Sequence, residues 1–195
     1  MARTAFVNRE TQETSISVEL DLDGSGVGDI KTGSRFLDHL LAQLAQHGLF
    51  DIKLSANGSD QHHVVEDVAI SLGRALGEAL GEKRGIVRMA HAVVPMDDAL
   101  VMVVVDIGGR GYAQVEAPFS GKTIGDLAAD LVQHFLESLA LEARMNLHVR
   151  VLRGTNDHHK AEAMFKALAR ALDGATRTDE RLQGGVPSTK DVIEG

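Results

Sequence analysis

The 195-residue chain contains no cysteine and no tryptophan, and it has one tyrosine and only three prolines. The absence of cysteine excludes disulfides, zinc–thiolate sites and thiol nucleophiles, so any metal would have to be held by histidine and carboxylate side chains. With a net charge of -8 and so few aromatic residues, the chain lacks the basic field and the stacking side chains of a nucleic-acid-binding protein. An anionic ligand would therefore be bound by a few local Lys or Arg residues.

Long apolar runs are also missing. No stretch approaches the roughly 18 to 20 apolar residues that span a bilayer, and the first ten residues, MARTAFVNRE, lack the apolar core of a signal peptide. We therefore expect a cytoplasmic protein with neither a membrane nor a nucleic acid as partner. With 44% hydrophobic and 25% charged residues, the composition is that of a folded chain, and at this length roughly 70% of the unfolded surface can be buried.

The sequence contains an internal repeat. The first copy, from His39, reads HLLAQLAQHGLFDIKLSANGSDQHHVVEDVAISLGRAL, and the second, from His134, reads HFLESLALEARMNLHVRVLRGTNDHHKAEAMFKALARAL, with one extra residue before its HH pair. Each copy has the pattern of a helix, a strand, a glycine turn and a second helix, and alternating, strand-like residues precede each copy at 14–22 and 100–107. We therefore predict an α+β fold of two duplicated half-domains, residues 1–92 and 93–195, forming one compact unit. Each half would be a small, mostly antiparallel sheet with two helices on one face.

Apolar spacing predicts where the elements of each half lie. The helices are expected at 34–46, 61–80, 124–143 and 157–172, and further strands at 49–55, 87–95 and 146–152. Asp60 and Asn156 precede the helices that carry the HH pairs and are candidates for their N-caps.

The two HH pairs belong to matching helical motifs. In HHVVE, His62 and Glu66 are four residues apart and share one helix face, whereas His63 points about 100° away. The motif HHKAE repeats this arrangement with His158, His159 and Glu162. One such helix can therefore provide ligands to two different metal ions.

A pseudo-twofold packing of these two helices would give each metal a His and a Glu from one helix and the remaining His from the other. The aligned residues His39 and His134 would supply the fourth ligands, and three imidazoles with one carboxylate suit Mn, Fe, Co or Zn. A single HH pair is usually a surface or capping feature, but two copies with a third histidine in register favour a metal site. His148, which lies outside this pattern, is expected to be an ordinary half-buried imidazole.

Several segments resemble the signatures of a known family. FLDHLLAQLAQHG, QHHVVED, PMDDAL and NDHHKAEAMFKALARA are similar to segments of the imidazoleglycerol-phosphate dehydratases of histidine biosynthesis, and the likeness runs from RETQET at Arg9 to PSTKD near the C-terminus. The resemblance implies a duplicated fold like domain 2 of ribosomal protein S5. It also implies two Mn²⁺ ions per active site and a hollow homo-oligomer of 24 subunits with active sites between subunits.

The resemblance also assigns residues by position. It implies one metal bound by His39, His63, His158 and Glu162, and a second bound by His62, Glu66, His134 and His159. It implies substrate contacts by Glu13, Gln43, Arg88, Arg110, Ser188, Thr189 and Lys190, with Arg88, Arg110, Ser188 and Lys190 around the phosphate. Two positions depart from the family pattern: Asp98, where the family commonly has Glu, and Asp191, where it commonly has Gly beside the expected phosphate-binding lysine.

The implied reaction is the dehydration of D-erythro-imidazole glycerol phosphate to imidazole acetol phosphate, with Glu13 as the acid/base and the ligand Glu162 as its competitor. The residues alone are also compatible with two other classes of protein. A metal-storage or structural-metal protein would explain the ligands but would leave the Arg and Lys residues unused. A dinuclear metallohydrolase would need carboxylates bridging ions about 3.5 to 4 Å apart, and no Asp-rich bridge is evident.

Overall fold

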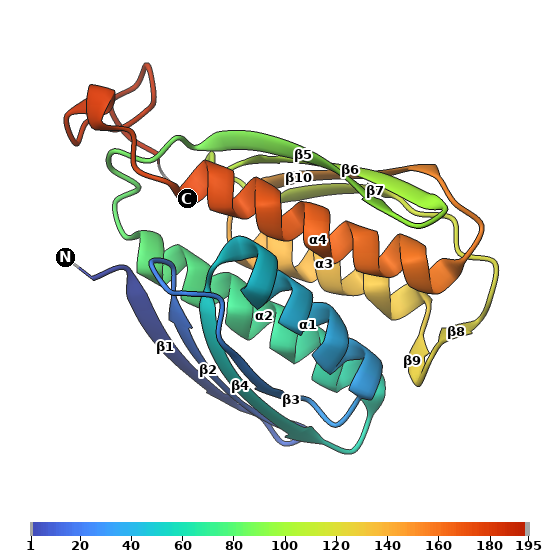
Figure 1. Ribbon diagram of the computed structural model, residues 1–195. Helices are drawn as coiled ribbons and strands as arrows, with labels where there is room; N and C mark the ends of the chain where they lie inside the picture. Colours follow the sequence, from blue (N-terminus) through green and yellow to red (C-terminus); the bar gives the residue numbers. More distant parts are fainter. Residues whose placement is uncertain (1, 194–195) are drawn as a thin grey trace.

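The computed structural model describes residues 2–193 and has two four-stranded sheets with the helices between them (Figure 1). The first sheet has the order β1 (Thr4–Glu10), β2 (Thr14–Asp21), β4 (Asp51–Gly58), β3 (Gly28–Lys31). The second has the order β5 (Met89–Met96), β6 (Ala99–Asp106), β10 (Asn146–Arg153), β7 (Tyr112–Glu116). In both sheets only the last strand runs parallel to its neighbour. The predicted α+β fold of two duplicated, mostly antiparallel halves is confirmed.

Two helices cover the inner face of each sheet: α1 (Arg35–Gly48) and α2 (Gln61–Leu80) in the first half, α3 (Asp130–Glu142) and α4 (Asp157–Thr176) in the second. The period-two pattern of β2 and β6 turns alternate apolar side chains, such as Ile16 and Val103, toward these helices. Between the layers, α2 packs on α3 and α1 packs on α4, so the two halves share one apolar core. All four helices begin at the same end of the molecule (Figure 1).

Both predicted N-caps are confirmed. The Asp60 carboxylate accepts hydrogen bonds from the backbone N–H groups of His62 (2.8 Å) and His63 (3.2 Å). Asn156 does the same for His158 (2.9 Å) and His159 (3.3 Å). Because the capped groups belong to the HH pairs themselves, the same bonds that start each helix also fix the backbone of its histidines.

The helix predicted at 124–143 begins only at Asp130, so the expected start was wrong. Residues before it form a short hairpin of β8 (Thr123–Ile124) and β9 (Leu127–Ala128), in which Gly125 has a φ of +62°. The Asp126 carboxylate at the hairpin tip accepts hydrogen bonds from the backbone N–H groups of Arg35 (2.8 Å) and Phe36 (2.9 Å). The hairpin therefore satisfies free donors at the start of α1, which a longer α3 could not do.

The expected division between residues 92 and 93 also needs correction, because it falls inside β5. This strand pairs with β6 from Met89 to Met96, so the change from the first half to the second lies between α2 and β5. The C-terminal tail, which includes a short 3₁₀ helix (Glu180–Leu182), returns to this connecting segment through the hydrogen bonds Asp179 N to Gly85 O and Gly85 N to Gly185 O, both 2.8 Å. Within residues 2–193, no helix is long and apolar enough to cross a membrane.

Candidate active site

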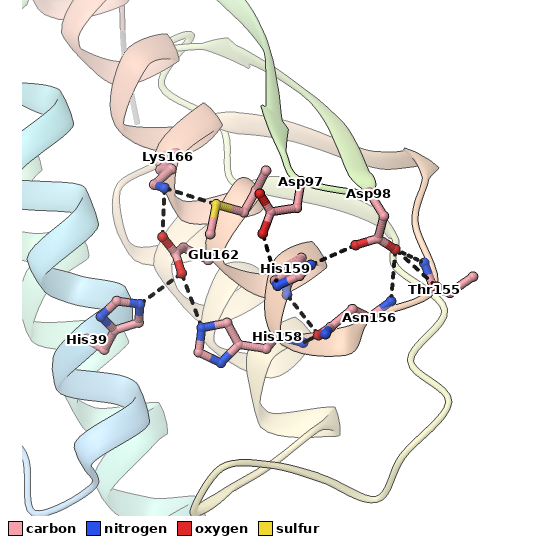
Figure 2. Close-up of polar contacts among 10 residues, drawn as sticks. His39, Asp97, Asp98, Thr155, Asn156, His158, His159, Glu162 and Lys166 are labelled. Atoms are coloured by element: carbon pink, nitrogen blue, oxygen red, sulfur yellow. Dashed lines mark hydrogen bonds and ion pairs between the residues drawn. The ribbon is translucent and has the colours of Figure 1, made fainter.

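One cluster of potential metal ligands joins α1 to α4. The Glu162 atom Oε2 lies 3.0 Å from His39 Nε2 and 3.2 Å from His158 Nε2 (Figure 2). These three ligand atoms all lie within 4.8 Å of one another. The cluster crosses the two halves, because His39 comes from the first and the HH motif from the second.

A second cluster joins α2 to α3 in the same way. It contains His62, Glu66 and His134, whose ligand atoms also lie within 4.8 Å of one another. The rings of His62 and His134 are stacked with centroids 4.6 Å apart. Among the residues that the structure describes, 2–193, His134 Nε2 is buried without a hydrogen-bond partner, and a carboxylate oxygen of Glu66 lies 3.7 Å away. Since an unpaired buried nitrogen is costly, a cation held by these three residues fits the arrangement.

The predicted direct packing of the two HH helices is wrong, because α2 packs on α3 and α4 packs on α1. Six of the eight expected ligands therefore meet in two triads, while His63 and His159 lie outside them. The ring of His63 stands at 84° to that of His62, and the ring of His159 stands at 89° to that of His158. The helical step of about 100° between adjacent residues turns the side chains of His63 and His159 to another face of the helix than their HH neighbours.

His63 and His159 instead face carboxylates of the two β-hairpins. His63 Nδ1 lies 3.3 Å from Glu13 Oε2. His159 lies between two carboxylates: its Nδ1 is 2.7 Å from Asp98 Oδ1 and its Nε2 is 3.4 Å from Asp97 Oδ2 (Figure 2). Asp97 was not among the residues expected from the sequence, and its backbone at the hairpin is left-handed, with φ of +46°.

Glu162 is buried and its two oxygens have different partners. Oε1 lies 2.6 Å from Lys166 Nζ, whereas Oε2 faces the two histidines of its triad (Figure 2). Burial by itself would raise the pKa of Glu162, but hydrogen bonds from Lys166 and His39 outweigh it and lower the pKa to about 2. The carboxylate is therefore ionised at neutral pH, which is the form that binds a cation.

Five of the expected substrate-binding residues line one open cavity of about 690 Å³: Arg88, Arg110, Ser188, Thr189 and Lys190. Arg88 is anchored there by Asp106, through bonds of 2.7 and 3.1 Å, and by the carbonyl oxygen of Pro187 at 2.8 Å. Asp191 is exposed and does not line the cavity, and its φ of +58° is the conformation that glycine adopts most easily.

The cavity and the triads lie at opposite ends of α4. The backbone N–H of Arg88 donates to the carbonyl oxygen of Ala175 near the end of the helix, whereas His158 is in its first turn. Seventeen residues of helix separate these two points, a distance of about 25 Å. A small phosphorylated molecule could not contact both sites of one chain at once.

The remaining expected residues lie apart from this cavity. Gln43 follows His39 by one turn of α1, and its Nε2 lies 3.4 Å from the His39 carbonyl oxygen. His148 was expected to be half-buried, but it is exposed on the outer face of the second sheet, with its ring centroid 5.7 Å from that of Tyr112. That expectation was wrong because alternation along β10 turns this residue away from the helices.

Known proteins share both the sequence and the fold. The family model described as imidazoleglycerol-phosphate dehydratase matches residues 32–172, which include both triads. The chain belongs to the imidazoleglycerol-phosphate dehydratase family. A dehydratase of this name from Dehalococcoides mccartyi is 61% identical over 98% of each chain, and one from Roseiflexus sp. is 58% identical, also over 98% of each.

Two solved structures of the family have the same fold. The imidazoleglycerol-phosphate dehydratase of Staphylococcus aureus superposes with a TM-score of 0.84 at 34% identity, covering 90% of this chain and 99% of its own. The Pyrococcus furiosus protein, crystallised in complex with (S)-C348, also has a TM-score of 0.84 at 40% identity, covering 96% of this chain and all of its own. Fold and family therefore agree over almost the whole chain.

Proposed function

We propose that this chain is a metal-dependent dehydratase of histidine biosynthesis, which converts D-erythro-imidazole glycerol phosphate to imidazole acetol phosphate and water. The observation that carries the proposal is the pair of His-His-Glu triads, built in register by the two halves of the chain. Relatives that are up to 61% identical among those compared bear the name of this dehydratase.

The proposed cofactor is Mn²⁺, with two ions per active site. His39, His158 and Glu162 would hold one ion with His63, and His62, Glu66 and His134 would hold the other with His159. Because His63 and His159 point away from the triads of their own chain, we assign them to the triads of neighbouring subunits. When bound, the two ions would act as Lewis acids and as a template for the imidazole of the substrate.

The distance between triads and cavity supports a shared active site. Since about 25 Å of helix separates them within one chain, a substrate bound at the triads would have its phosphate in the cavity of another subunit. We therefore propose a homo-oligomer, with the 24 subunits that the family resemblance implies. Ser188, Thr189 and Lys190 of the tail, with Arg110, would surround the phosphate, while Arg88 anchors the tail to the sheet.

The structure favours Glu13 over Glu162 as the acid/base of the proposed reaction. The reaction takes a proton from one carbon and a hydroxyl from the next, and the resulting enol becomes the ketone. Glu162 is buried and held by Lys166 and two histidines, so its oxygens are already committed. The Glu13 side chain is 60% exposed, and its carboxylate lies 3.3 Å from His63 Nδ1. A carboxylate that is free to approach the substrate is the better candidate for moving protons.

The test is an assay of the Mn²⁺-loaded protein with imidazole glycerol phosphate. We expect imidazole acetol phosphate, detected by its carbonyl group, and no product after chelation. Release of inorganic phosphate alone would contradict the lyase and favour a metallohydrolase. Tight metal binding without any turnover would favour a storage or structural-metal protein. Glu13→Gln should abolish turnover while the metal content stays at the wild-type value.

A further inference from the structure

The duplication places Asp98 and Glu13 in equivalent positions. Strands β2 and β6 have eight residues each and pair with β4 and β10 in the same register at Asp21 and Asp106, so Glu13 and Asp98 both stand directly before them. Each carboxylate faces the Nδ1 atom of the second histidine of an HH pair, at 3.3 Å for Glu13 and 2.7 Å for Asp98. The two residues therefore occupy matching places beside the two histidines that point away from the triads.

The two carboxylates differ in what else they contact. Asp98 Oδ2 accepts hydrogen bonds from the backbone N–H of Thr155 (2.6 Å), from its hydroxyl (3.0 Å) and from the backbone N–H of Asn156 (3.1 Å), while Oδ1 faces His159 (Figure 2). The Asp98 carboxylate is therefore fixed in place by three hydrogen bonds besides its contact with His159, whereas within residues 2–193 the contact recorded for the Glu13 carboxylate is that with His63.

A fixed carboxylate determines which nitrogen of the neighbouring imidazole carries the proton. Ionised Asp98 can only accept, so Nδ1 of His159 must donate to it, and the neutral ring keeps its lone pair on Nε2. Asp97 lies on the Nε2 side, but its side chain is 69% exposed and 3.4 Å away, so it is free to move aside. Metal-binding histidines commonly donate their second ring nitrogen to a carboxylate in this way.

We propose that Asp98 is a positioning residue, which fixes the tautomer and the direction of His159 so that Nε2 is presented as a metal ligand. This inference rests on the proposed function, since it takes His159 as a ligand. Asp98 acts through His159 and contacts neither substrate nor metal.

Replacing Asp98 by Asn should change the metal affinity in a way that a purely structural role of Asp98 would not predict. In Asp98→Asn the side-chain oxygen must still face the N–H groups of Thr155 and Asn156, so its NH₂ group turns toward His159. Nδ1 would then have to accept, and the proton would move to Nε2, where it blocks coordination. In Asp98→Ala neither tautomer is imposed. The Asn variant should therefore keep more of the fold than the Ala variant but bind metal less well.

The experiment measures Mn²⁺ affinity and stoichiometry by titration of the full-length protein, together with the melting temperature of the metal-free form. We expect Asp98→Asn to weaken one of the two ions per chain by about 10- to 100-fold. Asp98→Ala should bind that ion better than Asp98→Asn despite a lower metal-free melting temperature. Thr155→Val, which removes one bond to Asp98 but leaves the His159 contact, should bind both ions with wild-type affinity.

Two further variants keep the test decisive. Asp98→Glu keeps a carboxylate and should bind both ions. If Asp98→Ala does not fold, the metal affinities of Asp98→Glu and Asp98→Asn are compared instead. The inference would be overturned if Asp98→Asn bound both ions with wild-type affinity, or if it bound them more tightly than Asp98→Ala does. His159→Ala should lose one ion, and if it does while Asp98→Asn keeps both, only the inference fails. If His159→Ala keeps both ions, the ligand assignment of the proposed function fails as well.

Discussion

At the scale of single residues, the triads are distinguished by how their nitrogen and oxygen atoms are satisfied. Glu162 has a partner for each oxygen, whereas His134 Nε2 has none although it is buried. His148 has the same side chain in a different setting, on the outer face of a sheet. Substitution of each of these two histidines therefore tests whether His134 binds metal and His148 does not.

We expect His134→Ala to lose one of the two bound metal ions and most of the activity, because it removes one of the three proposed ligands of its triad. His148→Ala should keep both ions, since its ring contacts Tyr112 and no carboxylate cluster. Elemental analysis of the purified variants measures the difference. Equal metal contents in the two variants would contradict the assignment of ligands.

The repeat in the sequence pointed to the six residues that the structure brings together in the triads, because copies in register place like residues at like points of the fold. It did not predict their partners. A Lys four residues after a Glu occurs on many helices and gives no specific signal, so the contact of Lys166 with Glu162 was missed. The grouping of the ligands was also missed, because it depends on which helices pack together across the two halves.

At the scale of elements, the hairpin of β8 and β9 couples the two halves at the ligand end of the helices. The Asp126 carboxylate accepts hydrogen bonds from the first two backbone N–H groups of α1, which carries His39 and has Ser34 as its own N-cap residue. The Gln61 side chain at the start of α2 bonds to the backbone of Asp126 (2.8 Å) and Ala128 (3.1 Å). Sequence periodicity could not show this, because the apolar spacing of residues 124–128 also fits a helix. Edge strands β1, β3 and β7 were missed as well, since their short, mixed sequences carry little pattern.

Asp126→Ala should destabilise the metal-free protein by about 1 kcal/mol, which is the typical cost of losing a helix cap. For a chain of this size, that corresponds to a fall in melting temperature of about 2 to 4 °C. Thermal unfolding followed by circular dichroism measures it. Lys122→Ala, in the loop just before the hairpin, is the control and should change the melting temperature by less, because its side chain is exposed. Equal effects of the two substitutions would show that Asp126 does not act as a cap.

The C-terminal tail is the second element whose role can be tested. Lys190 lies in the tail and lines the cavity, far along α4 from either triad. Lys190→Ala should therefore raise KM several-fold with little change in metal content, because it removes a proposed phosphate contact and leaves the ligands in place. Steady-state kinetics and elemental analysis decide this. A loss of metal with unchanged KM would contradict the proposed division of roles.

At the scale of the whole molecule, the packing of the helices and the position of the cavity have the same consequence. The helices pack so that each chain forms two triads, and the remaining histidines and the cavity face elsewhere. Within one chain, neither triad meets its proposed fourth ligand, and neither lies beside the cavity proposed to bind the phosphate. The account therefore requires several copies of the chain around each active site.

Assembly should accordingly depend on metal, because ions shared between subunits couple binding to association. We expect chelation to reduce the native mass of the particle and Mn²⁺ to restore it. Native mass spectrometry or light scattering measures both steps. A particle of unchanged size after complete removal of metal would show that the ions do not bridge subunits.

The claim of a shared active site is tested most directly by mixing two inactive variants. One carries His134→Ala and lacks a metal ligand, and the other carries Arg110→Ala with Lys190→Ala and lacks phosphate contacts. After joint chelation and reassembly with Mn²⁺, some active sites would take their ligands from the second variant and their phosphate contacts from the first. We predict that the reassembled mixture forms imidazole acetol phosphate at a rate well above that of either variant alone, and that mixing without reassembly does not. A reassembled mixture no more active than its two components would contradict an active site shared between subunits.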